Sequence, residues 1–220
     1  MISKEYLENG IIVYQDEMLY KFTSDSILLS RFATVKKSDA VADFCAGSGV
    51  VGFNLYAINS GLIDSVSMFE MQPSLALLAQ KSIELNDLND KFSVFNTKLQ
   101  DIGSDFAGKF SLIVCNPPYM PVGHGFKDEN DLIAVCRTEL TLSLGELISA
   151  ISKCLKYKGR TAICHRADRL SDVIFEFKKN NIEPKRLQFV SGGNKEPYLF
   201  LIEGVKGGKS GIKILKNIVN

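Results

Sequence analysis

Long apolar runs are missing from this chain of 220 residues, and no stretch approaches the roughly 18 to 20 apolar residues that a membrane-spanning helix needs. Its opening residues, 1–6, lack the basic-then-apolar form of a secretion signal, so we expect a cytoplasmic protein without a membrane partner. Its five cysteines form no Cys-x-x-Cys pair, which indicates neither a disulfide framework nor a metal site. With 45% hydrophobic residues, the chain has enough apolar content for one large core.

Charge is almost balanced over the whole chain but not along it. The formal net charge is +1, whereas residues 151–220 hold 15 Lys and Arg residues against 6 Asp and Glu residues. A basic segment is the electrostatic footprint expected of a nucleic-acid partner, because each neutralised phosphate releases counterions. Lysines that only solvate exposed helix faces would give the same count. The composition alone leaves both interpretations open.

Strand and helix patterns alternate along most of the sequence. Short apolar runs predict strands over residues 41–44, 65–69, 92–95, 110–115, 160–164, 185–190 and 198–203. Longer patterns predict helices over residues 50–59, 73–86, 144–156 and 170–179. This alternation is typical of an α/β fold in which crossover connections build a mostly parallel sheet. A short turn, Gly192-Gly193-Asn194, joins the last two strands, which are therefore expected to form an antiparallel hairpin.

The segment before this alternation contains two short extended runs within residues 10–22, followed by an apolar helix from Ile27 to Ala33. Thr23 or Ser24 is a natural N-cap for that helix, because a side-chain hydroxyl can accept a hydrogen bond from a free backbone N–H. Two interpretations stay open. The segment is either a flap that covers one edge of the sheet, or it presents a polar helix cap to the ligand crevice.

A glycine-rich loop follows the first predicted parallel strand and opens a helix, which is where open α/β sheets bind ligands. Residues 47–52 satisfy Gly-x-Gly-x-x-Gly, and Glu70 lies near the end of the next strand, where an acidic residue can bind ribose hydroxyls. A dinucleotide site is one interpretation, but the Asp43 carboxylate would repel a pyrophosphate and attract an ammonium group. S-adenosylmethionine fits better, with its amino-acid tail against the backbone of residues 46–49.

Two residues outside the loop complete the expected cofactor site. Asp101 follows the third strand and would lie at the same edge of the sheet, where it could accept a hydrogen bond from an adenine amino group. Met71, next to Glu70, could cover the adenine face. Each has an ordinary alternative, since Asp101 could cap a helix and Met71 could pack in the core.

The tetrapeptide Asn116-Pro117-Pro118-Tyr119 ends an apolar run and is predicted to be a substrate site. Proline cannot continue a central strand, and each X-Pro bond holds the preceding residue extended, so this backbone is stiff. The Asn116 side-chain oxygen and the Pro117 carbonyl can both accept hydrogen bonds from an exocyclic NH2 group. Tyr119 can stack on the ring that carries this group. The alternative is that the two prolines only end a strand.

These motifs together resemble a known family. Asp43-x-x-Ala46-Gly47-Ser48-Gly49, Glu70, Asp101 and Asn116-Pro117-Pro118-Tyr119 are similar to the class I S-adenosylmethionine-dependent methyltransferases that modify exocyclic amino or amide nitrogens. The resemblance is closer to the bacterial tRNA(Val) adenine-N6 methyltransferases, through residues 20–29, 195–204 and 206–209. Cys45 is a departure, because many relatives carry glycine there.

The resemblance implies a Rossmann-like, seven-stranded sheet with helices on both faces, and a tRNA substrate methylated on N6 of adenosine 37, next to the anticodon. It implies S-adenosylmethionine, the product S-adenosylhomocysteine, and no metal. We expect one domain, with an N-terminal flap and helix over 1–34, a catalytic core over 38–205 and a basic tail over 206–220. The basic C-terminal third is expected to bind tRNA, and a monomer is favoured. The cofactor residues so indicated are Thr23, Asp43, Cys45, Ala46, Gly47, Gly49, Glu70, Met71, Asp101 and Asn116.

The chemistry expected of the tetrapeptide is in-line transfer of a methyl group to adenine N6. Hydrogen bonds from the amino group to the Asn116 and Pro117 oxygens would pull the nitrogen toward tetrahedral geometry and direct its lone pair at the methyl carbon. No strong base is needed, because the proton becomes acidic only after transfer. His124 and His165 are therefore interpreted as structural or loop residues. The target base must leave its stack, so Tyr119 would serve as its platform.

Other functions remain open from the sequence. The same tetrapeptide serves protein methyltransferases that modify a glutamine amide, and also guanine-N2, rRNA or DNA amino-methyltransferases. A nicotinamide-dependent oxidoreductase would need phosphate-compatible chemistry at Asp43. A non-catalytic nucleic-acid binder would not need Asp43, Glu70 and Asn116 together. Residues 120–137, rich in glycine, are expected either to close over the substrate or to be disordered in the free protein.

Overall fold

A computed structural model describes residues 2–17, 19, 23–117, 142–193 and 195–220. Its strands are β1 (Ile2–Tyr6), β2 (Ile12–Asp16), β3 (Asp39–Phe44), β4 (Ile63–Glu70), β5 (Phe92–Asn96), β6 (Phe110–Cys115), β7 (Leu155–Arg166), β8 (Ile182–Ser191), β9 (Pro197–Lys206), β10 (Lys213–Ile214) and β11 (Ile218–Val219). Its helices are α1 (Ser24–Phe32), α2 (Val50–Asn59), α3 (Pro73–Leu85), α5 (Leu144–Cys154) and α6 (Leu170–Lys179). The predicted alternation of strands and helices is confirmed.

The main sheet has the strand order β10-β8-β9-β7-β6-β3-β4-β5, and β11 also pairs with β8. Strands β3 to β7 pair in parallel, whereas β9 runs antiparallel to both β7 and β8. The seven longer strands therefore form the predicted Rossmann-like sheet with its antiparallel C-terminal hairpin. The two-residue strands β10 and β11 extend it at the β8 edge. The order reverses at β3, which lies between β4 and β6, and open α/β sheets bind ligands beside such a switch point.

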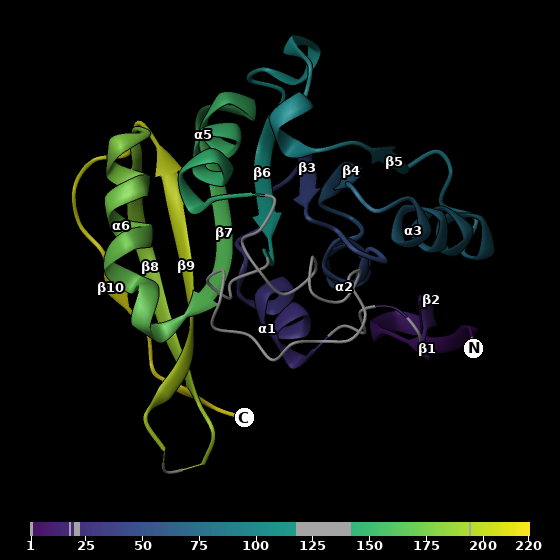
Figure 1. The fold of residues 1–220 in the computed structure, drawn as a ribbon, viewed down its shortest axis with the longest axis horizontal. Coiled ribbons are helices and arrows are strands. Elements are labelled where there is room, and N and C mark those ends of the chain that lie inside the picture. The colour runs from purple at the N-terminus through teal and green to yellow at the C-terminus, as the bar shows by residue number, and fades with distance from the viewer. Residues whose placement is uncertain (1, 18, 20–22, 118–141, 194) are drawn as a thin grey trace.

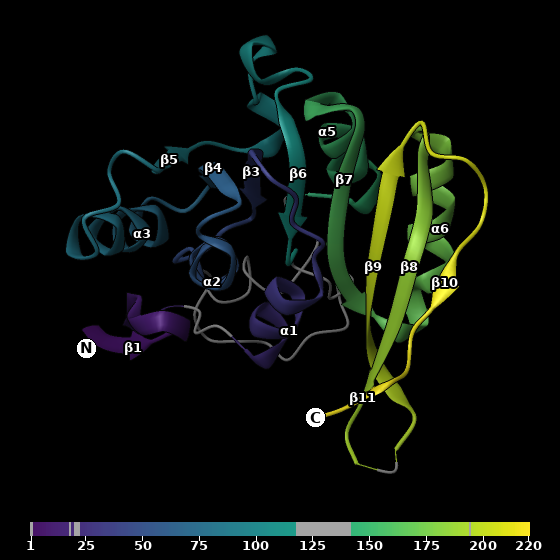
Figure 2. The same cartoon turned by 180° about the vertical axis from the view of Figure 1, so that it is seen from behind.

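Helices cover both faces of the sheet. Consecutive strand residues point to opposite faces, so Val114 of β6 packs with Phe53 of α2, while Ile113 packs with Ile148 of α5 and Phe177 of α6. Helices α1, α2 and α3 share the first of these faces. Figure 1 shows α5 and α6 in front of the strands, and the reverse view in Figure 2 shows them behind. Across the ranges that the structure describes, no helix is both long enough and apolar enough to span a bilayer.

The N-terminal strands β1 and β2 form a separate antiparallel sheet. Of the two extended runs predicted within residues 10–22, the first is confirmed as β2, and residues 18 and 20–22 of the second lie outside the described residues. Strand β1 precedes Gly10 and was not predicted. The chain turns at Asn9 and Gly10, which adopt positive φ angles of 52° and 80°. The Ile12 N–H then donates a hydrogen bond to Asn86 Oδ1 over 2.9 Å. The hairpin is thereby fixed to the end of α3 instead of extending the main sheet, as the right-hand side of Figure 1 shows.

The C-terminal tail follows the outer edge of β8. The Leu215 N–H donates to the Leu187 carbonyl over 2.7 Å, and the Asn220 N–H donates to the Ser191 carbonyl over 2.9 Å. The Asn220 side-chain amide also donates to Ser24 Oγ over 3.0 Å. The tail therefore returns along the sheet to the first turn of α1.

Candidate active site

Strand register places the predicted cofactor and substrate residues in one row. Phe44 of β3 pairs with Phe69 of β4 and with Cys115 of β6, and Cys115 pairs with Ile163 of β7. The following residues on these four strands are therefore level with one another: Glu70, Cys45, Asn116 and Cys164. Adjacent strands are about 4.8 Å apart. The expected cofactor end and the expected acceptor end thus lie side by side at the carboxyl edge of the sheet.

Asp43, one residue before the end of β3, is completely buried. Its Oδ2 accepts a hydrogen bond from the Gly52 N–H over 2.9 Å, while its Oδ1 has no hydrogen-bond partner among the described residues. Burial raises the pKa of this carboxyl to about 7; the Gly52 hydrogen bond opposes this shift and the charge of Glu70 adds to it. A buried oxygen without a partner is costly. The site is therefore suited to a cationic group placed against Oδ1.

The glycines of the loop serve two different purposes. A Cβ atom at Gly52 would lie 3.0 Å from Met68 Cε and 3.1 Å from Asp43 Oδ2, so Gly52 allows α2 to approach β3. Gly49 precedes α2 with φ 89°, and a Cβ there would lie 2.8 Å from Met68 Sδ. A Cβ at Gly47 would meet nothing within 4 Å. Gly49 and Gly52 are thus required for packing, whereas Gly47 borders open space.

Glu70 ends β4 and is 6% exposed. Its Oε2 accepts a hydrogen bond from the Gly47 N–H, and its Oε1 accepts one from the Gln72 N–H, each over 2.8 Å. Burial raises the pKa of the Glu70 carboxyl, and these backbone hydrogen bonds act in the opposite direction. An ionised carboxylate offers about four lone-pair directions. Glu70 therefore ties the glycine loop to β4 and still has acceptor capacity for ligand hydroxyls.

Cys45 begins the loop with φ 56°, in the left-handed region that favours glycine. Its thiol hydrogen-bonds to that of Cys115, whose pKa lies well above its ordinary value, first because of burial and then because of Cys45 itself. The four cysteines within the described ranges, Cys45, Cys115, Cys154 and Cys164, are free thiols. The backbone angle gives a physical reason for the glycine that the family resemblance implies at this position. Ala46 follows in the turn, and its N–H donates to the Phe69 carbonyl over 3.1 Å.

A residue that the sequence did not indicate supports the loop from the N-terminal hairpin. Gln15 of β2 is 1% exposed, and its side-chain amide donates a hydrogen bond to Ser48 Oγ. Gln15 and Ser48 lie far apart in sequence, and no local pattern connects them. The hairpin therefore contacts the glycine loop directly.

Three predicted cofactor residues lie at the margins of this arrangement. Thr23 is exposed and is the N-cap of α1, as predicted, although its side chain makes no capping hydrogen bond. Met71 is half-buried and follows Glu70. Asp101 is exposed at the end of the short 3-10 helix η2 (Leu99–Asp101). Their contacts with a cofactor stay predictions.

Asn116 follows β6 directly and is half-buried, and its side-chain amide is held at both ends. Its Nδ2 donates to Ser26 Oγ of α1 over 3.0 Å, and its Oδ1 accepts from Cys164 Sγ of β7 over 2.9 Å. Pro117 is buried next to it. The first turn of α1 thus faces the expected acceptor end of the site. Pro118, Tyr119 and the predicted lid over residues 120–137 lie outside the described residues.

His165 lies near the end of β7 and is 1% exposed. Burial lowers the pKa of its imidazole to about 4, and its Nδ1 accepts the Arg166 N–H over 3.0 Å. The ring also stacks on Phe200, with 6.3 Å between the ring centroids. A neutral, packed ring of this kind is consistent with the structural role predicted for it. His124 lies outside the described residues, and within the described ranges no group of His, Cys, Asp and Glu residues could hold a metal ion.

Solved structures share this fold. A predicted O-methyltransferase from Agrobacterium tumefaciens aligns with a TM-score of 0.69 at 16% identity, over 89% of this chain and 86% of that chain. Methanocaldococcus jannaschii Trm5, solved in complex with adenosine, aligns with a TM-score of 0.68 at 15% identity, over 94% of this chain and 57% of that chain. Identities this low establish the fold alone. The chain therefore has the fold of S-adenosylmethionine-dependent methyltransferases.

Several curated relatives are named tRNA1(Val) (adenine(37)-N6)-methyltransferase. The protein of that name from Parabacteroides distasonis is 25% identical over 179 residues, which cover 81% of this chain and 73% of the relative. The one from Histophilus somni is 27% identical over 71% of this chain and 65% of the relative, and one from Shewanella sp. (strain W3-18-1) is 24% identical over 64% and 58%. The chain thus spans less than two thirds of the Histophilus and Shewanella relatives. The methyltransferase small domain pattern matches residues 22–169, well over half of the sequence, and the chain belongs to that family.

Proposed function

We propose that this methyltransferase acts on the exocyclic N6 of an adenosine in tRNA, at position 37 next to the anticodon of tRNA(Val). The observation that carries the proposal is the row formed by Glu70, Cys45 and Asn116 at the switch point of the sheet. A carboxylate suited to ribose lies at the end of β4, and an amide suited to an NH2 group lies at the end of β6, with only β3 between them. The names of the curated relatives support the tRNA substrate.

The residues present fit S-adenosylmethionine. The unpartnered Asp43 Oδ1 suits an ammonium group, the space beside Gly47 suits the amino-acid tail, and Glu70 has lone pairs for ribose hydroxyls. A pyrophosphate would instead meet two carboxyl groups, which argues against a dinucleotide. When bound, S-adenosylmethionine supplies an electrophilic methyl group on a sulfonium. Thr23, Cys45, Ala46, Gly49, Met71 and Asp101 complete the proposed cofactor site.

The proposed work of the chain at the acceptor end is to orient one amino group. The Asn116 Oδ1 and the Pro117 carbonyl accept its two hydrogens, which turns the nitrogen lone pair out of conjugation with the ring and toward the donor. The Asp43 and Glu70 carboxyls are engaged with the loop, and the His165 ring is packed. No side chain needs to remove a proton before transfer. Pro118 and Tyr119 complete the proposed acceptor site.

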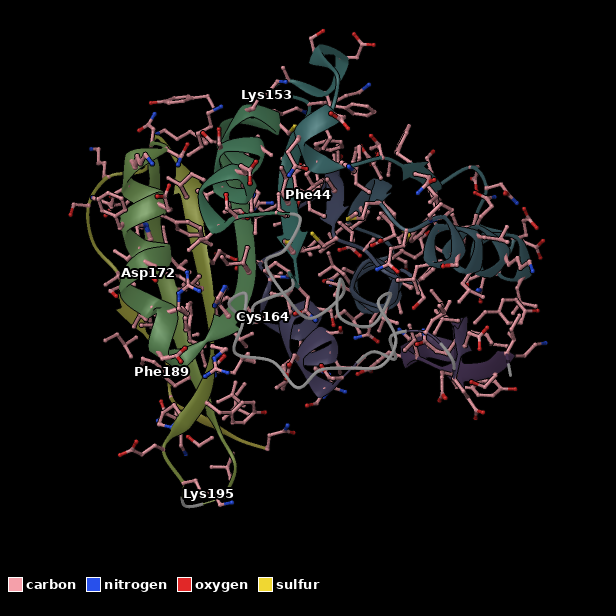
Figure 3. The ribbon with its side chains drawn as sticks, viewed as in Figure 1. Phe44, Lys153, Cys164, Asp172, Phe189 and Lys195 are labelled. Carbon is pink, nitrogen blue, oxygen red and sulfur yellow. The ribbon has the colours of Figure 1, made fainter. Side chains whose placement is uncertain are left out.

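Contact with tRNA is proposed to involve the basic C-terminal third. Strand β8 runs in the same direction as β6 and β7, so the turn after it lies at the same edge of the sheet as Asn116. Figure 3 shows Lys195 at the tip of this projecting hairpin. The proposal includes the domain layout stated above, with the tail of residues 206–220 docked on β8, a cytoplasmic location and a monomer.

One experiment tests this proposal. The purified protein is incubated with methyl-labelled S-adenosylmethionine and total tRNA from a strain that lacks the gene, and the labelled nucleoside is identified by mass spectrometry. We expect N6-methyladenosine in tRNA(Val). Label in rRNA, DNA or a glutamine-containing protein, but not in tRNA, would overturn the substrate while keeping the methyltransferase. No label from the methyl donor but binding of NADH would overturn the cofactor as well.

A further inference from the structure

The Asn116 amide is clamped between two elements that come from opposite ends of the chain. Ser26 lies in the first turn of α1, 90 residues before Asn116, and Cys164 lies on β7, 48 residues after it. Ser26 is 5% exposed and Cys164 is fully buried. Both partners of the half-buried Asn116 amide are therefore buried side chains. Figure 3 shows Cys164 at the end of β7 that approaches α1.

The two contacts engage different atoms of one amide. Ser26 Oγ accepts one hydrogen of Nδ2, and the Cys164 S–H donates to one lone pair of Oδ1. An asparagine amide offers two hydrogens and two acceptor lone pairs, so Oδ1 keeps one lone pair for a second donor. The terminal torsion of an unrestrained asparagine is broad and roughly two-fold. The clamp therefore selects both the plane of the amide and the direction of its oxygen.

The thiol is suited to this role because it stays protonated. Burial raises the pKa of Cys164 well above its ordinary value, and the charge of Asp25 adds to the shift. A neutral thiol donates to Oδ1, whereas a thiolate would repel it. Register explains why the thiol reaches the amide, since Cys164 follows Ile163, which pairs with Cys115 on the neighbouring strand.

We propose that Ser26 and Cys164 are positioning residues for methyl transfer, which hold the Asn116 amide with its free oxygen lone pair directed at the acceptor amino group. This inference rests on the proposed role of Asn116 in the function above. It assigns a function to the polar first turn of α1. It also means that the buried Cys164 orients the Asn116 amide in addition to packing in the core. Because both residues act through Asn116, their loss slows transfer without weakening the binding of either substrate.

Four variants separate positioning from packing. Ser26→Ala removes the acceptor for Nδ2, and Cys164→Val removes the donor to Oδ1 while keeping an apolar side chain of similar size. Cys164→Ser keeps a donor at the same place. Cys154→Val is the matched control, because Cys154 is an equally buried free thiol at the end of α5, where β7 begins, ten residues before Cys164 in the sequence. For each variant we measure kcat and KM for tRNA, the single-turnover rate of methylation, the affinity for S-adenosylhomocysteine and the melting temperature.

We expect Ser26→Ala and Cys164→Val to lower kcat about 10- to 100-fold, the scale of a misplaced reacting group, with KM and S-adenosylhomocysteine affinity unchanged. Cys164→Ser is expected to recover most of the rate, and Cys154→Val to keep the wild-type rate with a fall in melting temperature similar to that of Cys164→Val. Wild-type kcat in both Ser26→Ala and Cys164→Val would overturn the inference, and so would a Cys164→Ser protein as slow as Cys164→Val. A wild-type protein that methylates no adenosine would instead overturn the proposed function, which separates the two failures.

Discussion

The cofactor end and the acceptor end of the site differ in how far along the chain their contacts reach. Asp43 and Gly52 are 9 residues apart, and Gly47 and Glu70 are 23 apart. At the acceptor end, Asn116 binds partners 90 and 48 residues away. At the cofactor end, most of these hydrogen bonds run from backbone N–H groups to the Asp43 and Glu70 carboxylates. At the acceptor end, they join one side chain to another. Changes at the cofactor end should therefore disturb loop structure and binding together, while changes at the acceptor end should affect transfer alone.

Replacement of Asn116 by alanine should give the largest effect, and it should separate the rate of methyl transfer from the affinity for the cofactor. Loss of one positioned polar group at a reacting centre costs about 100- to 1,000-fold in rate. We expect single-turnover methylation to fall on that scale, while calorimetry shows nearly unchanged affinity for S-adenosylhomocysteine, since the Asn116 side chain hydrogen-bonds to Ser26 and Cys164 and not to the glycine loop. Asn59→Ala, at the far end of α2, is the matched control. Parallel losses of rate and cofactor affinity in Asn116→Ala would refute the division.

Replacement of Asp43 by asparagine should weaken the binding of the cofactor without abolishing methyl transfer. A hydrogen bond to a charged group is worth about 1.5–3 kcal/mol, which corresponds to roughly 10- to 100-fold in affinity. Because the pKa of Asp43 is about 7 in the ligand-free protein, an ammonium group that favours the carboxylate should release up to one proton on binding. Affinity should therefore rise as pH increases through 7. Calorimetry in buffers of different ionisation enthalpy measures the released proton, and a pH-independent affinity would place the ammonium elsewhere.

The same carboxyl makes the ligand-free protein sensitive to pH. Its pKa is raised on folding from 3.8 to about 7, so the folded state binds more protons than the unfolded state in that window. Stability is then lost as pH rises from about 4 to about 7 and stays at the lower level above it. In the Asp43→Asn variant, the amide oxygen of the new side chain can still accept the Gly52 N–H but carries no charge. The melting temperature of this variant should exceed that of the wild type at pH 8, and the gap should shrink toward pH 4.

Two glycine variants distinguish packing from ligand binding within the cofactor end. Gly52→Ala introduces a Cβ only 3.0 Å from Met68 and 3.1 Å from Asp43, and overpacking of this kind costs about 1–3 kcal/mol. Gly47→Ala meets no protein atom within 4 Å, so its left-handed φ of 58° costs about 1–2 kcal/mol without any overpacking, and its methyl group occupies the open space. We expect Gly52→Ala to lower the melting temperature more, and Gly47→Ala to lower S-adenosylhomocysteine affinity more. Thermal melts and calorimetry on the same samples measure both, and the reverse order would show that the space at Gly47 is not used.

Local chemistry explains what the sequence predicted well. The segment from Asp43 to Gly52 was recognisable because turn glycines, a strand end and a helix start follow one another in the chain. Seven strands and five helices were likewise recognisable from runs of residues. Ser26 and Cys164 were not, since nothing near either residue indicates that it meets Asn116. Only their positions could have indicated this contact. Ser26 lies in the polar first turn of α1, and Cys164 follows Ile163, which pairs with Cys115. The two-residue strands β10 and β11 are too short to carry a pattern.

The smallest expected effect concerns Cys45, at the position where the family resemblance implies glycine. Left-handed backbone costs a non-glycine residue about 1–2 kcal/mol, and Cys45 has φ 56°. Glycine would relieve that cost but add roughly 0.4–1 kcal/mol of entropy to the unfolded chain, and the hydrogen bond to the Cys115 thiol would be lost. These terms nearly cancel, so Cys45→Gly should raise the free energy of unfolding by no more than about 1 kcal/mol. Cofactor affinity should stay the same, because the backbone conformation that forms the loop is already the glycine one. Denaturant melts and calorimetry measure both, and a large loss of stability would mean that the Cys45–Cys115 contact, not the turn, holds β3 and β6 together at the site.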